Sequence, residues 1–278
     1  MKLLIKNALL KIKGTIGRFL SLFFIIALGL GFFSGVKETS KDMYITANKY
    51  YDDNKLYDYK IVSTYGMSND DIESLKKLEN VETVEGAYFV DVLVESKVYR
   101  MHSILDNMNK FVLKEGRMPL NDNECLAENG VHKIGDTIKI SSNEYLKNTE
   151  FKVVGLIESP VYIGTEKGIS NIGNGKLSSF VYLNKEAFKM DFFTEAYLIG
   201  KGTSETNSYS DEYENEAKKI YDELKELKPI RETIRYEEIL EEATKEITKN
   251  EDKIKNEELK NRNKLKVRPF TINLKSIV

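Results

Sequence analysis

The side chains best suited to covalent catalysis in this sequence are one cysteine and two histidines. A thiolate nucleophile with an imidazole base would need Cys125 to lie beside His102 or His132. Cys125 stands in the run ECLA at 124–127, where a small buried hydrophobic residue is the ordinary explanation. We therefore expect no catalytic residue, and an exported hydrolase is the weakest of three functional hypotheses.

The same residue types limit disulfides and metal sites. One cysteine excludes an intrachain disulfide, and one cysteine with two histidines excludes a Cys/His zinc cluster. The 44 acidic residues are spread along the chain, and no pair of carboxylates stands out as a general acid and base. The sequence thus predicts no metal site and no cofactor.

A glycine-rich stretch at 168–176 (GISNIGNGK) superficially resembles a phosphate-binding loop. That motif requires a glycine where this chain has Ser170, and a serine or threonine where it has Leu177. No clear strand precedes the stretch either. We interpret it as a flexible loop, so any ATP hydrolysis linked to this protein must be performed by a separate subunit.

Charge and hydropathy exclude two broad classes of protein. The 42 basic and 44 acidic residues give a net charge of −2, so no overall positive field attracts nucleic acid. A mean hydropathy of −0.41 and 31% charged residues exclude a protein that lies mostly inside a bilayer. Any contact with a membrane must therefore be local.

One apolar segment, residues 19–36 (FLSLFFIIALGLGFFSGV), carries no charge. Its 18 helical residues would reach about 27 Å, close to the hydrocarbon thickness of a bilayer. Residues 1–18 contain basic and no acidic side chains, with a spacing that suits an amphipathic helix at the membrane surface or an ordinary basic flank. The positive-inside rule then predicts a cytoplasmic N-terminus and an extracytoplasmic region after Val36.

A cleaved signal peptide is the alternative interpretation of this segment. Its apolar core is longer than the usual 7–15 residues, and the sequence FFSG at 32–35 forms a poor cleavage site. We therefore expect a retained transmembrane helix. Ala27, Gly31 and Gly35 recur every four residues, so they share one helix face on which another helix could pack closely.

The region after Val36 mixes strand and helix patterns without a regular βαβ repeat, which predicts an α+β fold. A strand at 58–64 precedes a capping box at 68–71 (SNDD), which predicts a short helix. Further strands are predicted at 84–94, 97–105, 124–127, 137–140, 151–157, 180–183 and 196–199.

Four short motifs occur in a fixed order within this region: residues 111–119 (FVLKEGRMP), 124–126 (ECL), 134–138 (IGDTI) and 151–157 (FKVVGLI). Together with the N-terminal span, they resemble the extracytoplasmic core domain of MacB/FtsX-like ABC transporter permeases. The resemblance covers about residues 1–245. It implies a partner ATPase subunit, further permease helices or a second permease copy in the lipid bilayer, and no cofactor on this chain.

The motif residues can also be interpreted without the family, as residues that shape the backbone and its turns. Gly116 can adopt a positive φ, Pro119 stiffens the loop exit, and Gly135-Asp136 suits a tight turn. Arg117 could form an ion pair with Glu124 or with another carboxylate and so fix the loop.

The C-terminal part shows two helical patterns. One, at 211–228, is predicted to stop at Pro229. The other, at 235–265, offers a broken apolar seam that suits a coiled-coil arm and a solvated single helix equally. In some relatives of the permease family a long coiled coil is inserted here, and this stretch resembles its first arm.

These predictions divide the chain into a basic segment (1–18), a transmembrane helix (19–36), a core domain (37–232), a charged arm (233–266) and an irregular tail (267–278). The family pattern implies three more spans, so we expect the chain to be the front part of a permease, truncated or frameshifted. The leading hypothesis is a non-enzymatic permease component. The runner-up is a single-span extracellular binding or scaffold protein.

Overall fold

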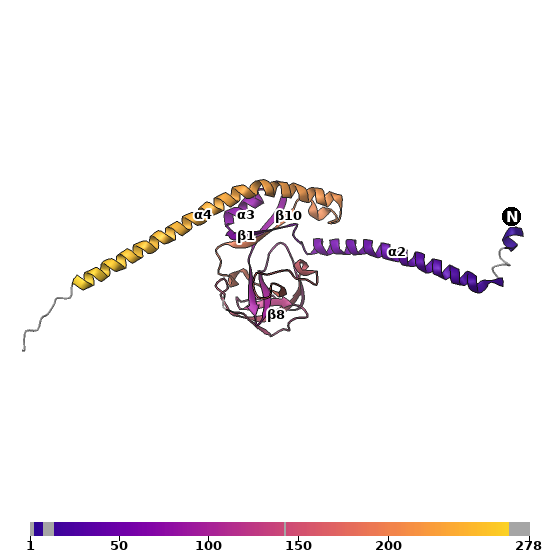
Figure 1. Cartoon of the computed structure of the whole chain (residues 1–278), viewed down its shortest axis with the longest axis horizontal. Coiled ribbons are helices and arrows are strands. Elements are labelled where there is room, and N and C mark those ends of the chain that lie inside the picture. The colour runs from indigo at the N-terminus through magenta and orange to yellow at the C-terminus, as the bar shows by residue number, and fades with distance from the viewer. Residues whose placement is uncertain (1–2, 8–13, 142, 267–278) are drawn as a thin grey trace, which may run out of the picture.

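The computed structural model describes residues 3–7, 14–141 and 143–266. It consists of a domain from which two long helices extend in opposite directions (Figure 1). Parts of the predicted basic segment and all of the predicted tail at 267–278 lie outside the described residues.

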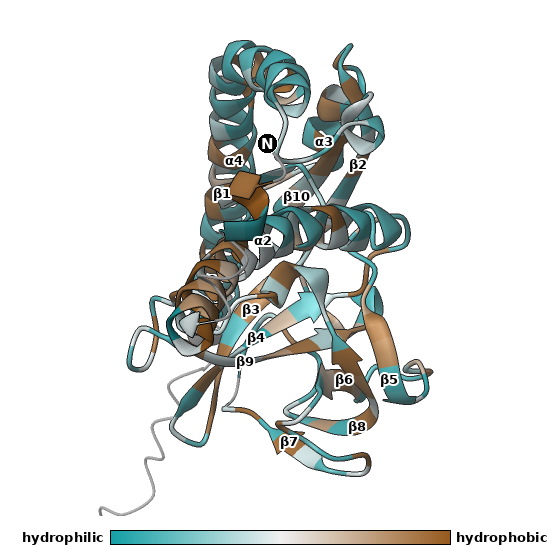
Figure 2. Ribbon diagram, turned by 90° about the vertical axis from the view of Figure 1, so that its right-hand side faces the viewer, coloured by the Kyte–Doolittle hydropathy of each residue, from teal (hydrophilic) through white to brown (hydrophobic). Residues whose placement is uncertain are grey.

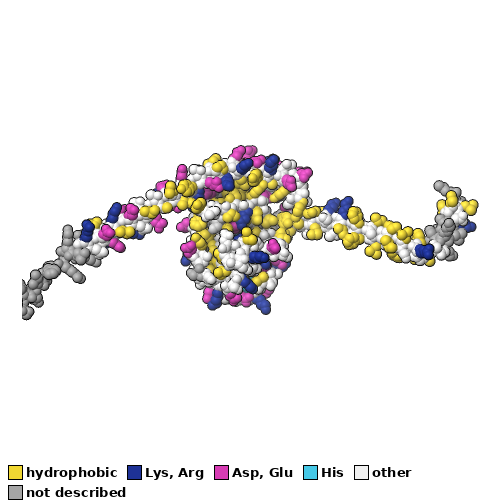
Figure 3. Space-filling model, viewed as in Figure 1, with side chains coloured by type: hydrophobic (Ala, Val, Ile, Leu, Met, Phe, Trp, Pro, Cys, Tyr) yellow, Lys and Arg dark blue, Asp and Glu magenta, His cyan; other side chains and the backbone are white. Residues whose placement is uncertain are grey.

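The first long helix, α2 (Ile16–Asp53), contains the whole apolar segment and continues beyond it. Of the described residues, it is the one helix long and apolar enough to cross a membrane. Its apolar side chains are exposed in the isolated chain (Figure 3). The helix does not end where the apolar run ends, so residues 37–53 form a helical stalk that joins the span to the domain.

A small antiparallel sheet holds β1 (Tyr59–Met67), β10 (Phe193–Gly200) and β2 (Val81–Ala87), in that order. The capping box is confirmed: the Ser68 hydroxyl accepts a hydrogen bond from the Asp71 amide, and α3 (Asn69–Lys76) follows. Apolar side chains of α3 and of the C-terminal helix cover one face of this sheet, around Ala196 and Leu198.

A larger mixed sheet of seven strands forms the rest of the domain. Its order is β3-β4-β9-β6-β8-β5, and β7 also pairs with β8. The strands are β3 (Phe89–Val94), β4 (Lys97–Ser103), β5 (Val112–Gly116), β6 (Glu124–Glu128), β7 (Thr137–Lys139), β8 (Glu150–Glu158) and β9 (Leu177–Leu183). Short 3-10 turns occur at η1 (Pro160–Tyr162), η2 (Lys185–Ala187) and η3 (Thr203–Glu205).

The predicted α+β class and most predicted strands are confirmed, but the single strand at 84–94 is wrong. The segment divides at Tyr88 into β2, which belongs to the small sheet, and β3, which belongs to the larger one. The chain changes sheets here because β2 pairs with β10, whereas β3 turns back through residues 95–96 to pair with β4. The sequence gives no sign of this change of sheet, because β-forming residues continue without a break across it.

The second long helix, α4 (Asp211–Lys266), also departs from prediction because it continues through Pro229. Proline removes one backbone hydrogen bond and disturbs the preceding turn, at a cost of about 3 kcal/mol. Contacts on both sides of the proline hold the helix on the domain. Ile220 is buried before it, and Arg231 bonds to Asp71 at 2.6 Å after it.

Beyond the domain α4 continues as a single arm (Figure 1), and the helix labelled α4 is coloured mostly hydrophilic in Figure 2. The apolar side chains Leu240, Ile247 and Ile254 are exposed along it. The structure therefore shows the predicted helix, and whether it forms a coiled coil stays a prediction.

Candidate functional site

The three small residues predicted for helix packing lie on the apolar part of α2. A Cβ atom added at Gly31 or Gly35 would meet nothing within 4 Å in the described chain. The face that they share with Ala27 is thus open to another helix. Their packing role stays a prediction, since this structure contains a single chain.

The Gly116 loop is built around one carboxylate. Arg117 donates two hydrogen bonds to Glu124, at 2.8 and 2.7 Å, and Glu124 also accepts the amide of Leu120 at 2.8 Å. The Arg117 bond and the Leu120 amide lower the pKa of Glu124 to about 2. The expected Arg117–Glu124 pair is therefore present, and it fixes the loop that carries Pro119.

Gly116 has a positive φ, as expected, and so does Gly135 in the predicted tight turn. Gly116 (φ 86°) ends β5 opposite Gly155, where β5 and β8 approach closely. Gly135 (φ 92°) donates its amide to the carbonyl of Val153 at 2.9 Å. In the same turn Asp136 accepts the amide of Lys133 at 2.9 Å. These contacts are structural, because each satisfies a backbone group of the turn.

The residues tested as catalytic groups do not form a reactive constellation in the described chain. Cys125 is fully buried, and burial raises the pKa of its thiol to about 12. A reactive cysteine needs the opposite environment, one that stabilises the thiolate. The glycine-rich stretch closes as a tight turn, in which Ile169 bridges Lys176, and strand β9 follows it rather than a helix. Among the described residues no group of three His, Cys, Asp or Glu side chains could hold a metal ion.

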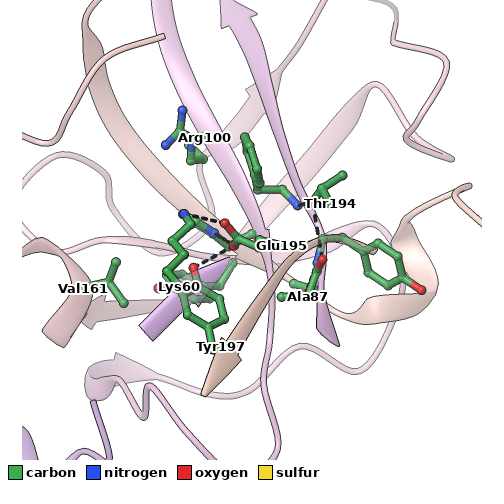
Figure 4. Close-up of polar contacts among 12 residues, drawn as sticks. Lys60, Ala87, Arg100, Val161, Thr194, Glu195 and Tyr197 are labelled. Carbon is green, nitrogen blue, oxygen red and sulfur yellow. Dashed lines mark hydrogen bonds and ion pairs between the residues drawn. The ribbon is translucent and has the colours of Figure 1, made fainter. Parts of the chain in front are cut away.

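The most unusual polar feature is a buried charge cluster where the two sheets meet, which we define as Lys60, His102, Glu195 and Tyr197. Glu195 lies on β10 and is 0% exposed. Lys60 on β1 reaches it at 2.5 Å, and the Tyr197 hydroxyl donates to it at 2.7 Å (Figure 4). His102 Nδ1 on β4, in the larger sheet, lies 3.3 Å from the same carboxylate. The cluster therefore ties the two sheets together.

Aromatic rings enclose this cluster. The Lys60 ammonium lies 5.3 Å from the centre of the Phe89 ring and 5.5 Å from that of Tyr197. His102 stacks on Tyr182 at 5.2 Å. These rings offer the cation a favourable electrostatic surface. A charge in such a place is costly unless all its partners are present.

The protonation states follow from the contacts. Burial opposes the charge on Glu195, but the His102 and Lys60 interactions outweigh it and lower the pKa of Glu195 to about 2. Burial lowers the pKa of His102, which is neutral at pH 7. We assign its proton to Nδ1, because the ionised Glu195 carboxylate can only accept a hydrogen bond from it. Nε2 then accepts a hydrogen bond from the Tyr162 hydroxyl at 2.5 Å.

Acidification is expected to destabilise the domain through His102. The folded pKa lies below 6.5 and the unfolded value near 6.5, so the unfolded state binds more protons as the pH falls. The contribution of His102 to the free energy of unfolding is therefore fully present above pH 6.5 and is lost as the pH falls below that value. Glu195 adds a second loss of stability between about pH 4.5 and 2. Urea denaturation, followed by circular dichroism at several pH values from 7.5 to 5, measures how the free energy of unfolding changes with pH.

The matched variants for this slope are His102→Gln and His132→Gln. Burial also lowers the pKa of His132, so each variant should remove part of the pH dependence and the double variant should remove most of it. An unchanged slope in His102→Gln would contradict the protonation states assigned here.

Sequence reasoning missed the charge cluster. Glu195 carries the one usable signal, because it is a charged residue inside the strand sequence FTEAYLIG at Phe193–Gly200. Its partners come from positions far away in the sequence, and no local spacing connects them.

Comparisons with known proteins find matches among solved structures. The sequence matches no protein-family model and no curated protein. Among solved structures, the extracellular domain of the noncanonical ABC-type transporter YknZ from Gram-positive bacteria is similar, with 12% identity over 50% of this chain and 75% of that one and a TM-score of 0.32. The periplasmic region of MacB from Actinobacillus actinomycetemcomitans has 13% identity over 60% of this chain and 75% of that one, with a TM-score of 0.32.

With such TM-scores the structural likeness is loose, and the proposals that follow rest on this chain's own residues.

Proposed function

We propose that this chain is the N-terminal part of the permease component of a MacB/FtsX-type ABC transporter. Its N-terminus lies in the cytoplasm, α2 spans the membrane, and the α+β domain and the α4 arm lie outside. The observation that carries the proposal is the continuity of α2, which runs without a break from the apolar segment to the domain.

The end of α2 is attached to the segment that leads into α4. Asn48 accepts the amide of Ser208 at 2.6 Å, and the hydroxyls of Tyr51 and Tyr209 lie 3.3 Å apart. The ring of Tyr44 contacts that of Tyr209, with 4.6 Å between their centres. A displacement of α2 would therefore be passed directly to the start of α4.

The start of α4 is in turn attached to the small sheet through Asp58. This carboxylate accepts the hydroxyl of Tyr213 on α4 at 2.7 Å, the hydroxyl of Thr203 at 2.7 Å and the amide of Gly200 at 2.7 Å. Tyr59 on β1 also donates to the carbonyl of Ala217 at 2.7 Å. Helix and sheet therefore move as one unit.

Two sets of ion pairs with buried carboxylates extend this unit to the larger sheet. One is the charge cluster around Glu195, and the other joins Lys185 to Glu85 of β2 at 2.9 Å. Glu85 also accepts the amides of Asp106 and Asn107, which follow β4. These contacts suit a domain that transmits movement rather than one that performs chemistry.

The mechanism we propose is mechanical. ATP hydrolysis by a separate ATPase subunit moves the membrane helices, and α2 carries that movement to the extracytoplasmic domain during substrate export. The face of Ala27, Gly31 and Gly35 would pack on another permease helix or on a second copy. The chain itself performs no catalysis and needs no cofactor in this scheme.

The orientation can be tested by cysteine labelling, because the native Cys125 is buried and silent. In intact cells, a membrane-impermeant maleimide is expected to label Lys139→Cys, whose parent side chain is 70% exposed, on the outer side. Lys6→Cys should be labelled only after the cells are permeabilised. The reverse pattern, or labelling of both without permeabilisation, would contradict the proposed topology.

A second experiment separates a permease from a membrane-anchored scaffold. The full chain, purified in mild detergent from cells that express the transporter, is expected to bring with it an ATPase activity that a matched preparation lacking the chain does not have. Gly31→Leu, which blocks close helix packing, should reduce that activity. Recovery of the chain in the membrane without any associated ATP hydrolysis would favour the scaffold.

A further inference from the structure

We propose that residues 159–166 form a latch on the larger sheet, that this latch opens in acid, and that His102 is the group that senses the pH. The latch follows β8 and contains η1. Its residues 163–166 are exposed. Tyr162 holds η1 on the sheet, because its hydroxyl lies 2.5 Å from His102 Nε2 and its ring stacks on that of Phe180, with 4.4 Å between the ring centres.

His102 is 3% exposed and is surrounded by ionisable groups. They face it from each of the surrounding elements: Glu195 and Tyr197 on β10, Lys60 on β1, Arg100 on its own strand β4, Asp91 on β3, Tyr182 on β9 and Tyr162 on η1. Lys60, Arg100, Glu195 and Tyr197 are among the residues drawn in Figure 4.

While His102 is neutral, the charges around it balance. Lys60 pairs with Glu195 at 2.5 Å, and Arg100 donates to both oxygens of Asp91, at 2.6 and 2.8 Å. Two cations are thus matched by two carboxylates. A proton added to His102 would be a third positive charge, with no further carboxylate facing it among the described residues. A buried charge without a counter-charge is costly.

A second proton on His102 also conflicts with the hydrogen bond of Tyr162. Nδ1 already donates to Glu195, so the new proton must bind Nε2, which now accepts a hydrogen bond from the Tyr162 hydroxyl. The structure shows no other hydrogen-bond partner for this hydroxyl in the described part of the chain. Protonation therefore leaves the Tyr162 donor without an acceptor unless η1 moves to where water can supply one.

Opening of the latch relieves both conflicts while the sheets stay intact. The other groups that face His102 lie on strands that are paired in sheets, whereas η1 belongs to neither sheet. Immediately after the latch the chain is anchored again: Lys167 pairs with Glu128 at 3.0 Å, and the Ile169 carbonyl accepts a hydrogen bond from Arg100 at 3.1 Å. Movement is thus confined to the latch, and it lets water reach the imidazole.

The open latch also changes the surface of the domain. Phe180 is 3% exposed, and the stacked ring of Tyr162 covers it. Acid therefore exposes an aromatic surface that is hidden at neutral pH.

The size of the response has an upper bound. Burial lowers the pKa of His102 in the closed latch, whereas a hydrated imidazole in the open latch returns toward the ordinary value of 6.5. The open form then binds the proton more tightly, so acid favours it. For a group with a pKa of 6.5, the opening equilibrium can rise by at most about thirtyfold between pH 7.5 and 5.

Hydrogen exchange, measured by mass spectrometry on the full chain in detergent micelles, tests the latch. The reporters are the amides of Val161 and Tyr162, which bond to Ser159. After correction for the intrinsic effect of pH on exchange, we expect their protection to fall about ten- to thirtyfold from pH 7.5 to 5. Up to 1 M urea should leave their exchange unchanged, because a local opening exposes little surface, whereas the exchange of β10 amides should accelerate.

Matched variants identify the sensing group. His102→Gln should abolish the pH dependence at Val161 and Tyr162, since glutamine can donate to Glu195 and accept from Tyr162 but does not titrate. His132→Gln is the control and should retain that dependence, because the His132 ring contacts Tyr99 instead. Tyr162→Phe keeps the ring and removes the hydroxyl, so the latch should exchange about fivefold faster at pH 7.5.

Three results would overturn the proposal: latch protection that does not change with pH, a pH dependence that persists in His102→Gln, or latch exchange that responds to urea as strongly as that of β10. If His102→Gln does not fold, as checked by circular dichroism, the urea comparison and Tyr162→Phe decide. None of these outcomes bears on membrane topology or on the association with an ATPase, so the test is independent of the proposed function.

Discussion

Replacing Glu195 with alanine is expected to lower the free energy of unfolding by about 3–5 kcal/mol, the usual cost of breaking a buried charge pair from one side. The carboxylate is fully buried and holds Lys60, His102 and Tyr197 together. Without it, the Lys60 ammonium remains between aromatic rings with no counter-charge. Such a loss would be a large part of the stability of an ordinary domain.

Urea denaturation in detergent micelles, followed by circular dichroism, measures this change. The chain has no tryptophan, so far-ultraviolet signals of the strands are the suitable probe. The surface variant Glu150→Ala is the matched control, because its ion pair with Lys139 is exposed on both sides. We expect that control to change stability by less than about 1 kcal/mol.

A double-mutant cycle separates the charge pair from simple loss of packing. Lys60→Met alone should also be strongly destabilising, since it leaves the buried Glu195 carboxylate without its cationic partner. The double variant Lys60→Met with Glu195→Met removes both charges, and we expect it to be less destabilised than the sum of Lys60→Met and Glu195→Met, each measured singly. Additive effects would show that the two side chains contribute independently, contrary to the network described here.

Local patterns predicted much of the fold. The apolar run at 19–36, the capping box at 68–71 and the strands around the motifs all depend on neighbours in sequence, and the structure places helices and strands there. The failures at Tyr88 and Pro229 have another origin. At both positions long-range contacts decide the outcome: strand pairing with different sheets in one case, and packing of α4 on the domain in the other.

The polar sites divide in the same way. The Arg117–Glu124 pair could be anticipated because seven residues and one tight loop separate its partners. The Glu195 cluster could not, since it joins β1, β4 and β10, whose residues are brought together only by the contact between the two sheets. A groove of about 510 Å³ between β1 and α4 was equally hidden, because it is lined by a helix that was predicted to end at Pro229.

Substitution of Gly116 by alanine is the second change with a large expected effect, a loss of about 2–4 kcal/mol in the free energy of unfolding. Two costs add. The residue has φ 86°, a conformation that costs a side chain about 1–2 kcal/mol. A methyl group there would also overlap the Val154 carbonyl and come within 2.9 Å of the Gly155 Cα, so the backbones of β5 and β8 must separate.

Gly135→Ala isolates the first of these costs. Gly135 has a similar φ of 92°, but a Cβ atom there would meet nothing within 4 Å, so we expect a loss of only about 1–2 kcal/mol. The difference between the two variants then measures the close approach of β5 and β8. Equal losses would show that these strands can move apart freely, and the loop of Arg117 and Pro119 would not be fixed by the glycine that precedes it.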